Sequence, residues 1–209
     1  MVGQKSDGRN RSKMTDWTNL DYVVVDVEGN GQQPPDLVEL AAVPIVGGVI
    51  GEPVSWLVRP DRPITPMARR IHGITNEAIA RAPKFEDIKV DVLLALSHPA
   101  LVAHNAHVDV DVLRRKLTGW ECPEVFDTLK LSRRFVPNQM SHKLGSLVEA
   151  FKLAEGLSSE LRPHRATYDA VVTARLFQML ATTNSVPRSL DELRDQPSGG
   201  GRDEAATLF

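Results

Sequence analysis

The apolar positions of the chain form short continuous runs at first and show helical spacing later. Residues 21–27 (DYVVVDV) are apolar almost without interruption, which is typical of a strand buried on both faces. Residues 37–60 predict two further strands that turn at Gly47-Gly48, because a glycine pair between apolar runs indicates a hairpin. Residues 100–105 predict another short strand. The chain therefore opens with three strands before its longer helices.

The later part of the chain alternates strands with helices. Residues 123–135 indicate a last strand that runs into a helix, and residues 66–75 and 76–83 look like two short helical pieces. Apolar residues at helical spacing predict longer helices over 84–98, 106–120, 141–153 and 165–183. This order of elements predicts an α/β domain around a mixed sheet of about five strands.

The polar ends of the chain set the expected domain limits. Residues 1–17 are polar and predict a disordered tail, residues 18–184 form the expected domain, and residues 185–209, which contain SGGG, predict a flexible tail. A length of 209 residues with 42% hydrophobic and 25% charged residues suits a single globular domain.

Composition narrows the cellular setting. A single cysteine, Cys122, excludes an internal disulfide and suits a reducing compartment. No apolar run approaches the roughly 20 residues that span a bilayer, and the polar start lacks a signal-peptide centre. We therefore expect a cytoplasmic protein without a membrane partner. The net charge of −2 gives no overall basic surface of the kind that indicates a nucleic-acid partner. It does not exclude such a partner, because acidic site residues would cancel a local group of basic residues in the sum.

Asp26 and Glu28 are unexpected in the first buried strand. Residues two apart in a strand point to the same side, so the two carboxylates would repel each other at the strand end. Either the pair faces water or it holds a cation, because burying such charges is costly without a counter-charge. A pair of this kind is by itself a weak signal.

A second acidic position follows the strand over 100–105. Asp109 lies near the start of the next helix, where the positive helix end favours an anion. Asp111 is turned by roughly 200° from Asp109 on a helix, so the two cannot share a site, and Asp111 is expected at the surface. His104 and Asn105 end the strand, where they could contact a substrate or simply hold the loop.

A third group lies before and on the last long helix. Asp169 is on the helix, and His164 precedes it on a loop after Pro163, from where it can turn toward the same site. A loop histidine can act as a base near neutral pH, since its unperturbed pKa is about 6.5. Hard oxygen ligands from Asp26, Glu28, Asp109 and Asp169 would suit two Mg²⁺ or Mn²⁺ ions. Two such metal ions side by side assist phosphoryl transfer.

In this order and spacing the motifs resemble the DEDD 3′→5′ exonucleases of the histidine-bearing branch. D-x-E is Asp26-Val27-Glu28, HNAHVDVDVL places Asp109, and HRATYD places His164 and Asp169. The resemblance extends over residues 21–180 and includes RIHGITNEAI. It implies a ribonuclease-H-like fold, two divalent ions and stepwise release of nucleoside monophosphates from single-stranded or mismatched DNA 3′ ends, as in proofreading or repair.

The resemblance also implies substrate contacts. The candidates lie in the first motif, in the I-H-G-I-T segment and at the strand end before the second motif: Val27, Gly29, Met67, Ile71, His72, Thr75, His104 and Asn105. For Met67 and Ile71 a plain core position is the alternative. The histidine-bearing branch includes the proofreading epsilon subunit of bacterial DNA polymerase III, and Val27, Gly29 and Asn30 stand where the epsilon-like pattern has threonines. Val108 and Val112 replace phenylalanines of the second motif, and we expect both to fill the core and to alter packing only.

Partners and alternatives follow from the same resemblance. The single-stranded 3′ end is the expected substrate, and a DNA polymerase is a possible associate. The terminal residues Leu208 and Phe209, behind the SGGG linker, resemble a peptide that docks on the bacterial sliding clamp, although the usual glutamine is Ala205 here. The alternatives are an RNA-trimming exoribonuclease like ribonuclease T and a non-catalytic polymerase accessory subunit.

Overall fold

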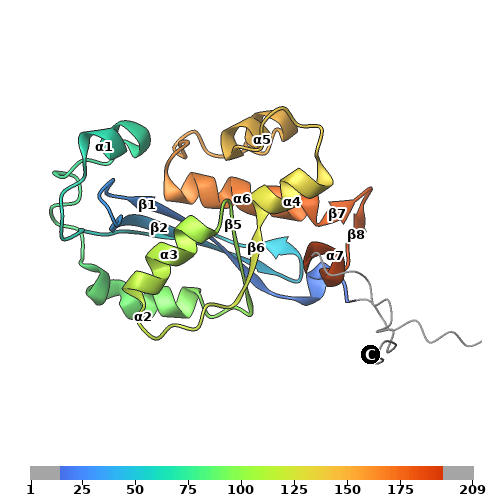
Figure 1. Cartoon of the computed structure of the whole chain (residues 1–209), viewed down its shortest axis with the longest axis horizontal. Coiled ribbons are helices and arrows are strands. Elements are labelled where there is room, and N and C mark those ends of the chain that lie inside the picture. Colours follow the sequence, from blue (N-terminus) through green and yellow to red (C-terminus); the bar gives the residue numbers. More distant parts are fainter. Residues whose placement is uncertain (1–14, 195–209) are drawn as a thin grey trace, which may run out of the picture.

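The structure is a computed structural model that describes residues 15–194. Its core is a six-stranded sheet in the order β3-β2-β1-β5-β6, with β4 paired to the other part of β2 (Figure 1). Strand β1 is antiparallel to β2 and parallel to β5, and β5 is parallel to β6. The strands are β1 (Tyr22–Gly29), β2 (Leu37–Val46), β3 (Val49–Ile50), β4 (Val54–Leu57), β5 (Ala100–Ala103) and β6 (Glu124–Asp127).

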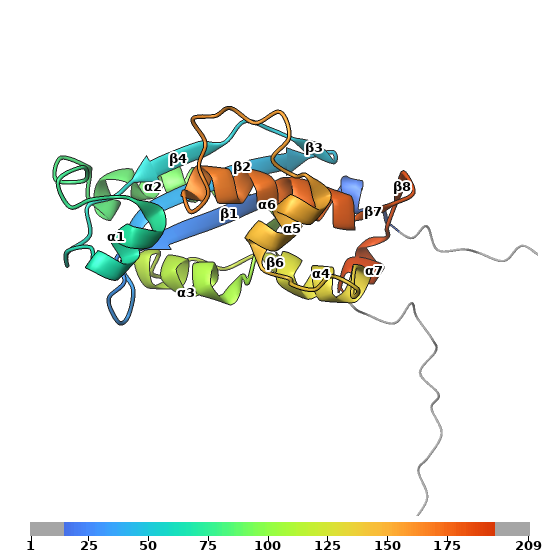
Figure 2. The same cartoon turned by 90° about the horizontal axis from the view of Figure 1, so that it is seen from above.

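Helices cover both faces of the sheet, as the two views show (Figures 1 and 2). Tyr22 and Val24 pack with residues of α4, α5 and α6 on one face, while Val23 and Val25 pack with α2 and α3 on the other. The helices are α1 (Pro66–His72), α2 (Phe85–Ala95), α3 (His107–Lys116), α4 (Thr128–Phe135), α5 (Leu144–Phe151), α6 (Ala166–Leu180) and α7 (Leu190–Arg194). Burial of β1 on both faces explains its continuous apolar run.

The sheet brings three strand ends to one edge. The parallel strands β1, β5 and β6 all end there, and α3 and α4 begin just after β5 and β6. Side chains that follow parallel strands in an α/β sheet meet at this carboxyl edge. The site residues of the first two motifs therefore lie at neighbouring strand ends.

One predicted helix is wrong. The segment over 76–83 forms turns and no helix, and α1 already ends at Gly73, which adopts a left-handed φ of 73°. Asn76 then fastens the loop to the backbone of Ile64, accepting from its N–H at 2.8 Å and donating to its carbonyl at 3.3 Å. These bonds hold the start of the segment against the backbone just before α1.

The folded part is longer than expected at both ends. Trp17 is 2% exposed and packs edge-on against Phe177 at a ring distance of 5.7 Å, although it lies in the segment predicted to be a disordered tail. At the other limit, the hairpin of β7 (Thr182–Thr183) and β8 (Val186–Pro187) continues past residue 184 and leads into α7, where Leu190 and Leu193 are buried. Isolated apolar residues in polar segments thus extend the core at both limits. Among the described residues, no helix combines the length and apolar character needed to cross a membrane.

Candidate active site

The first motif and the third motif converge at the end of β1. Asp26 and Glu28 are two apart in β1 and share the face of the sheet that α6 covers. Asp169 lies in the first turn of α6. The carboxylates of these three residues offer oxygen atoms that all lie within 4.8 Å of one another. A single cation could therefore contact all three side chains.

Asp109 joins the cluster from the opposite layer. It lies in the first turn of α3 and is only 4% exposed. Its Oδ1 accepts a hydrogen bond of 3.0 Å from the backbone N–H of Val27, the residue between Asp26 and Glu28. This bond fixes the carboxylate against the D-x-E backbone and leaves its second oxygen for other partners. Asp111, on the same helix, is exposed.

Burial and mutual repulsion make the cluster reluctant to ionise. Burial is the largest cause of every shift, and it raises the pKa of both Glu28 and Asp109 to about 8. The pKa of Asp26 is raised well above its usual value by burial and by the charges of Asp109 and Asp169. Burial raises the pKa of Asp169 to about 6, and the nearby charge of His164 keeps this rise smaller than it would otherwise be.

The donor set fits a divalent cation of the magnesium type. It consists of carboxylate oxygens only, which are the ligands that Mg²⁺ and Mn²⁺ prefer and which do not select zinc. Positive charge at this position would also relieve the repulsion that, after burial, raises the pKa values of Asp26 and Glu28. Raised carboxylate pKa values in a cluster of this kind are a common sign of a functional site.

His164 stands at the entrance to α6. It is exposed and adopts a left-handed φ of 61°, which is uncommon for a residue other than glycine. Its charge acts on Asp169, so the two residues of the third motif lie on the same side of the site. Because His164 precedes the helix, it avoids the angular separation that a helical position would impose.

The strand end after β5 has a structural role. His104 uses both ring nitrogens, at 2.9 Å from the hydroxyl of Thr128 and at 3.1 Å from the carbonyl of His142. Asn105 has a φ of 65°, and its backbone N–H donates to Asp127 at 3.0 Å. These contacts tie the end of β5 to α4 and to the loop before α5. For His104 and Asn105, these contacts favour the expectation that they hold the loop over the expectation that they contact a substrate.

The I-H-G-I-T segment divides into exposed and buried residues. Met67 and Ile71 lie one helical turn apart on α1 and are 74% and 51% exposed, so they are not core residues. His72 is buried, and its Nδ1 accepts from the N–H of Ile74 at 3.0 Å. Thr75 accepts from the N–H of Ala78 at 3.1 Å. Of these four side chains, Met67 and Ile71 are exposed, Thr75 is half-buried and His72 is buried.

The departures from the epsilon-like pattern have separate effects. A Cβ at Gly29 would lie 3.2 Å from the Cβ of Pro35, so the glycine permits a close approach of the following loop. Asn30 is fully buried, and its side chain accepts from the N–H groups of Gln32 and Asp36. Asn30 therefore replaces a threonine with a side chain that closes this loop.

The two valines of the second motif differ from each other. Val112 is 2% exposed and fills the core, as expected. Val108 is 45% exposed, so the expectation that it fills the core is wrong. Val108 is the second residue of α3 and lies on the side of the helix away from the sheet, where a smaller apolar residue is tolerated.

Two charged residues beside the cluster were missed from the sequence. Glu39 of β2 is 3% exposed, and Arg165 forms an ion pair with it. A glutamate inside the apolar run LVELAAV was a signal of a buried, paired acid. Its partner could not be read from the sequence, because 126 positions separate the two residues.

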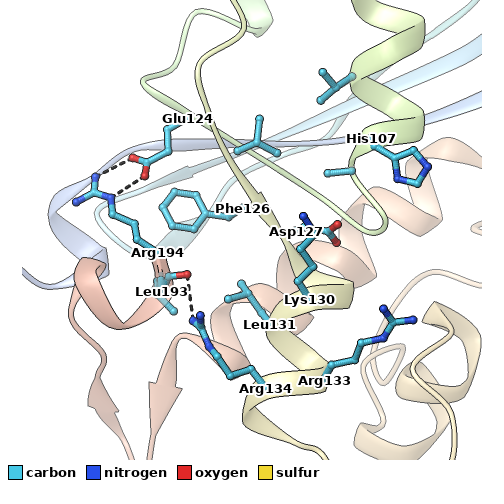
Figure 3. Close-up of a pocket in the computed structure, with 13 residues that line it drawn as sticks. His107, Glu124, Phe126, Asp127, Lys130, Leu131, Arg133, Arg134, Leu193 and Arg194 are labelled. Atoms are coloured by element: carbon cyan, nitrogen blue, oxygen red, sulfur yellow. Dashed lines mark hydrogen bonds and ion pairs between the residues drawn. The ribbon is translucent and has the colours of Figure 1, made fainter. Parts of the chain in front are cut away.

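The structure also has a hollow beside β6. It has a volume of about 850 Å³ and is lined by residues of α3, β6, α4 and α7 (Figure 3). Glu124 and Arg194 pair within it, with nitrogen–oxygen distances of 2.6 and 2.7 Å. None of the four clustered acids lines this hollow. The carboxylates with raised pKa values therefore gather in the acidic cluster and not in this hollow.

Comparison with known proteins gives the same assignment. The sequence profile of the RNase_T family, described as exonuclease, matches residues 23–177. Exodeoxyribonuclease 10 of Escherichia coli K12 is 35% identical over 176 residues, which cover 84% of this chain and 76% of that protein. The 3′-5′ exonuclease DinG of Bacillus subtilis is 33% identical over 182 residues, which cover 83% of this chain but only 19% of DinG.

Solved structures extend the comparison. Exonuclease X in complex with 5′ overhanging duplex DNA has 35% sequence identity and a TM-score of 0.68, covering 83% of this chain and 98% of that one. Escherichia coli exonuclease I in complex with a dT13 oligonucleotide has 18% identity and a TM-score of 0.65, covering 78% and 41%, and shares the fold. The ribonuclease-H-like fold expected from the motifs is confirmed. The chain belongs to the exonuclease family, as a 3′→5′ exonuclease of the DEDD type.

Proposed function

We propose that the protein removes nucleoside monophosphates one at a time from the 3′ end of single-stranded DNA, by metal-assisted hydrolysis. The observation that carries this proposal is the convergence of Asp26, Glu28 and Asp169 within 4.8 Å, with Asp109 bonded to the backbone between the first two. Relatives described as complexes with DNA support the choice of substrate. Proofreading or repair of mismatched ends would use the same activity.

Each residue of the cluster has a role in this proposal. Asp26, Glu28, Asp109 and Asp169 would hold two Mg²⁺ or Mn²⁺ ions. Such ions, when bound, stabilise the charge that develops on the attacking and leaving oxygens of a phosphodiester. His164 takes the proton from the attacking water as general base, which its exposed position before α6 allows. The bond between Asp109 and Val27 keeps the D-x-E backbone fixed during turnover.

The terminal nucleotides would be held by a small surface. Met67 and Ile71 project from α1 as exposed apolar side chains, which suits contact with a base or sugar. Val27 and Gly29 offer backbone close to the reacting phosphate. His72, Thr75, His104 and Asn105 would act by supporting this surface, because each already makes a hydrogen bond within the chain. A short grip agrees with an aromatic content of only 5%.

Further partners belong to the same proposal. Relatives described as DNA polymerase III PolC-type match this chain at 35% identity, although the chain spans only 12% of their length, and they motivate an association with a polymerase. The clamp-binding peptide at Leu208 and Phe209 lies outside the described residues. A cytoplasmic location stays a prediction that rests on the single cysteine.

A panel of labelled oligonucleotides tests the proposal. Single-stranded, fully paired and 3′-mismatched ends are compared as matched DNA and RNA sequences with Mn²⁺. We expect mononucleotide release, with single-stranded and mismatched DNA degraded faster than paired DNA and faster than RNA. Faster degradation of RNA would instead favour the trimming exoribonuclease, and DNA binding without any product would favour a non-catalytic accessory subunit.

Metal binding has its own test. Mn²⁺ should raise the melting temperature of the native protein, because positive charge relieves the repulsion within the cluster. The same addition should leave a variant with Asp26→Ala and Asp169→Ala unchanged. An equal rise in both proteins would mean that the ions bind elsewhere.

A further inference from the structure

Glu39 is a fifth acidic residue beside a cluster that is already hard to ionise. It lies on β2 directly opposite Glu28 of β1, and it is 3% exposed. Its charge is among the causes that raise the pKa values of Asp26, Glu28 and Asp169. A buried acid at this position adds negative charge beside the cluster and so destabilises the metal-free fold. Its contacts should therefore serve a purpose other than packing.

Three donors from the start of α6 converge on Glu39. Its Oε2 accepts from Nε of Arg165 at 2.9 Å and from the backbone N–H of Ala166 at 2.9 Å. Its Oε1 accepts from Nη2 of Arg165 at 2.5 Å. This two-pronged contact has the geometry that a guanidinium offers and an ammonium cannot reproduce.

Glu39 also completes the helix start. Arg165 is the residue before α6, and its side chain forms no capping hydrogen bond. The first N–H of the helix, on Ala166, is instead satisfied by Glu39 from the neighbouring strand. The start of α6 is thus fastened to β2 by one buried carboxylate.

His164 lies directly before this fastening, whereas Asp169 lies within α6. His164 is exposed and precedes the helix with a φ of 61°, a conformation that persists only where the surroundings impose it. The two residues that follow it, Arg165 and Ala166, are the two that Glu39 binds. Asp169 lies inside α6, whose place is already set by fully buried residues such as Phe177.

We propose that Glu39 and Arg165 are a positioning pair that holds His164 in the orientation in which it can take the proton of the attacking water. Neither residue needs to touch the reacting atoms. Arg165 neutralises Glu39, and Glu39 holds the backbone immediately after His164. This inference rests on the proposed role of His164 as general base.

The first test separates turnover from binding. Glu39→Gln keeps the shape and some acceptor capacity but removes the charge that holds Arg165. We expect kcat on a single-stranded DNA oligonucleotide to fall by about 10–100-fold. The KM for the oligonucleotide and the Mn²⁺ concentration for half-maximal rate should stay unchanged. Glu52→Gln, the same change at an exposed position after β3, is the matched control and should keep the native kcat.

A second variant guards against a folding defect. Arg165→Lys keeps the positive charge beside Glu39 and loses the two-pronged contact, so it should remain folded and lose kcat in the same sense. Far-UV circular dichroism and the melting temperature check the fold of each protein. An increase in KM without loss of kcat would mean that Arg165 binds substrate directly, and it would overturn the inference.

The decisive test repeats Glu39→Gln in a His164→Ala background. If the pair acts through His164, the second substitution should change the remaining kcat by less than about twofold, because contributions through one residue do not add. Multiplication of the two losses would overturn the positioning role alone. Native kcat in His164→Ala itself would contradict the proposed function of His164, and with it this inference.

Discussion

Glu28 allows the repulsion within the acidic cluster to be measured by a single substitution. Glu28→Gln removes one charge and keeps the size of the side chain. In the metal-free fold, burial and the charges of Asp169 and Glu39 raise the pKa of Glu28 from 4.5 to about 8. At about 1.4 kcal/mol per pKa unit, this shift is equivalent to about 5 kcal/mol. Solvent screening at the partly exposed carboxylate reduces the expected difference to about 2 kcal/mol.

The sign of the pH dependence follows from the raised pKa. The folded chain binds this proton more tightly than the unfolded chain, so the stability contributed by protonated Glu28 is fully present below pH 4.5. It is lost as the pH rises through the folded pKa of about 8. In EDTA, the native protein should therefore lose more unfolding free energy than Glu28→Gln between roughly pH 5 and pH 9. Urea unfolding followed by tryptophan fluorescence measures this difference.

The control and the refuting result are equally specific. Glu52→Gln removes one exposed carboxylate that does not belong to the cluster. The free energy of unfolding of this variant should depend on pH in the same way as that of the native protein. Addition of Mn²⁺ at high pH should restore more stability to the native protein than to Glu28→Gln. If native protein and Glu28→Gln lose the same free energy over this pH range, the cluster does not carry the repulsion that its burial implies.

Three further predictions concern other parts of the chain. Asp109→Asn should lower kcat by about 10³-fold or more, while Asp111→Asn on the same helix should keep it, and equal losses would contradict the assignment. His104→Ala should cost about 2 kcal/mol in urea unfolding through two lost hydrogen bonds, with kcat nearly unchanged, whereas a large loss of kcat would give His104 a substrate contact. Deletion of Leu208 and Phe209 should reduce capture of the protein by an immobilised bacterial sliding clamp, and equal capture would rule out the clamp peptide.

The sequence predicts the central elements because their patterns are local. The apolar run of β1 and the spacing of Asp26 and Glu28 within it already define a buried strand whose end carries two like charges. The angular separation of Asp109 and Asp111 likewise follows from helix geometry, and the structure has the first buried and the second exposed. The family motifs then predict that these separate segments come together in one site.

The rest of the site depends on contacts between distant residues. From the sequence, Arg165 is expected to be an ordinary surface arginine. Its pairing with Glu39 of β2 is visible only in the structure, because no local sequence pattern predicts it. Trp17 lies in a polar segment, and its burial depends on Phe177 at the far end of the domain. Val108 was expected in the core because it replaces a phenylalanine of the family motif, but it is exposed because of how α3 faces the sheet.

In the proposed mechanism, divalent ions act with Asp26, Glu28, Asp109 and Asp169 to cleave a DNA 3′ end. Digestion of a 5′-labelled single-stranded DNA oligonucleotide tests it most directly, with Mg²⁺, with EDTA, and with Asp26→Ala protein in Mg²⁺. We predict a ladder that shortens by one nucleotide at a time in the first reaction and intact substrate in the other two. A ladder of the same rate in EDTA or with Asp26→Ala protein would contradict the claim.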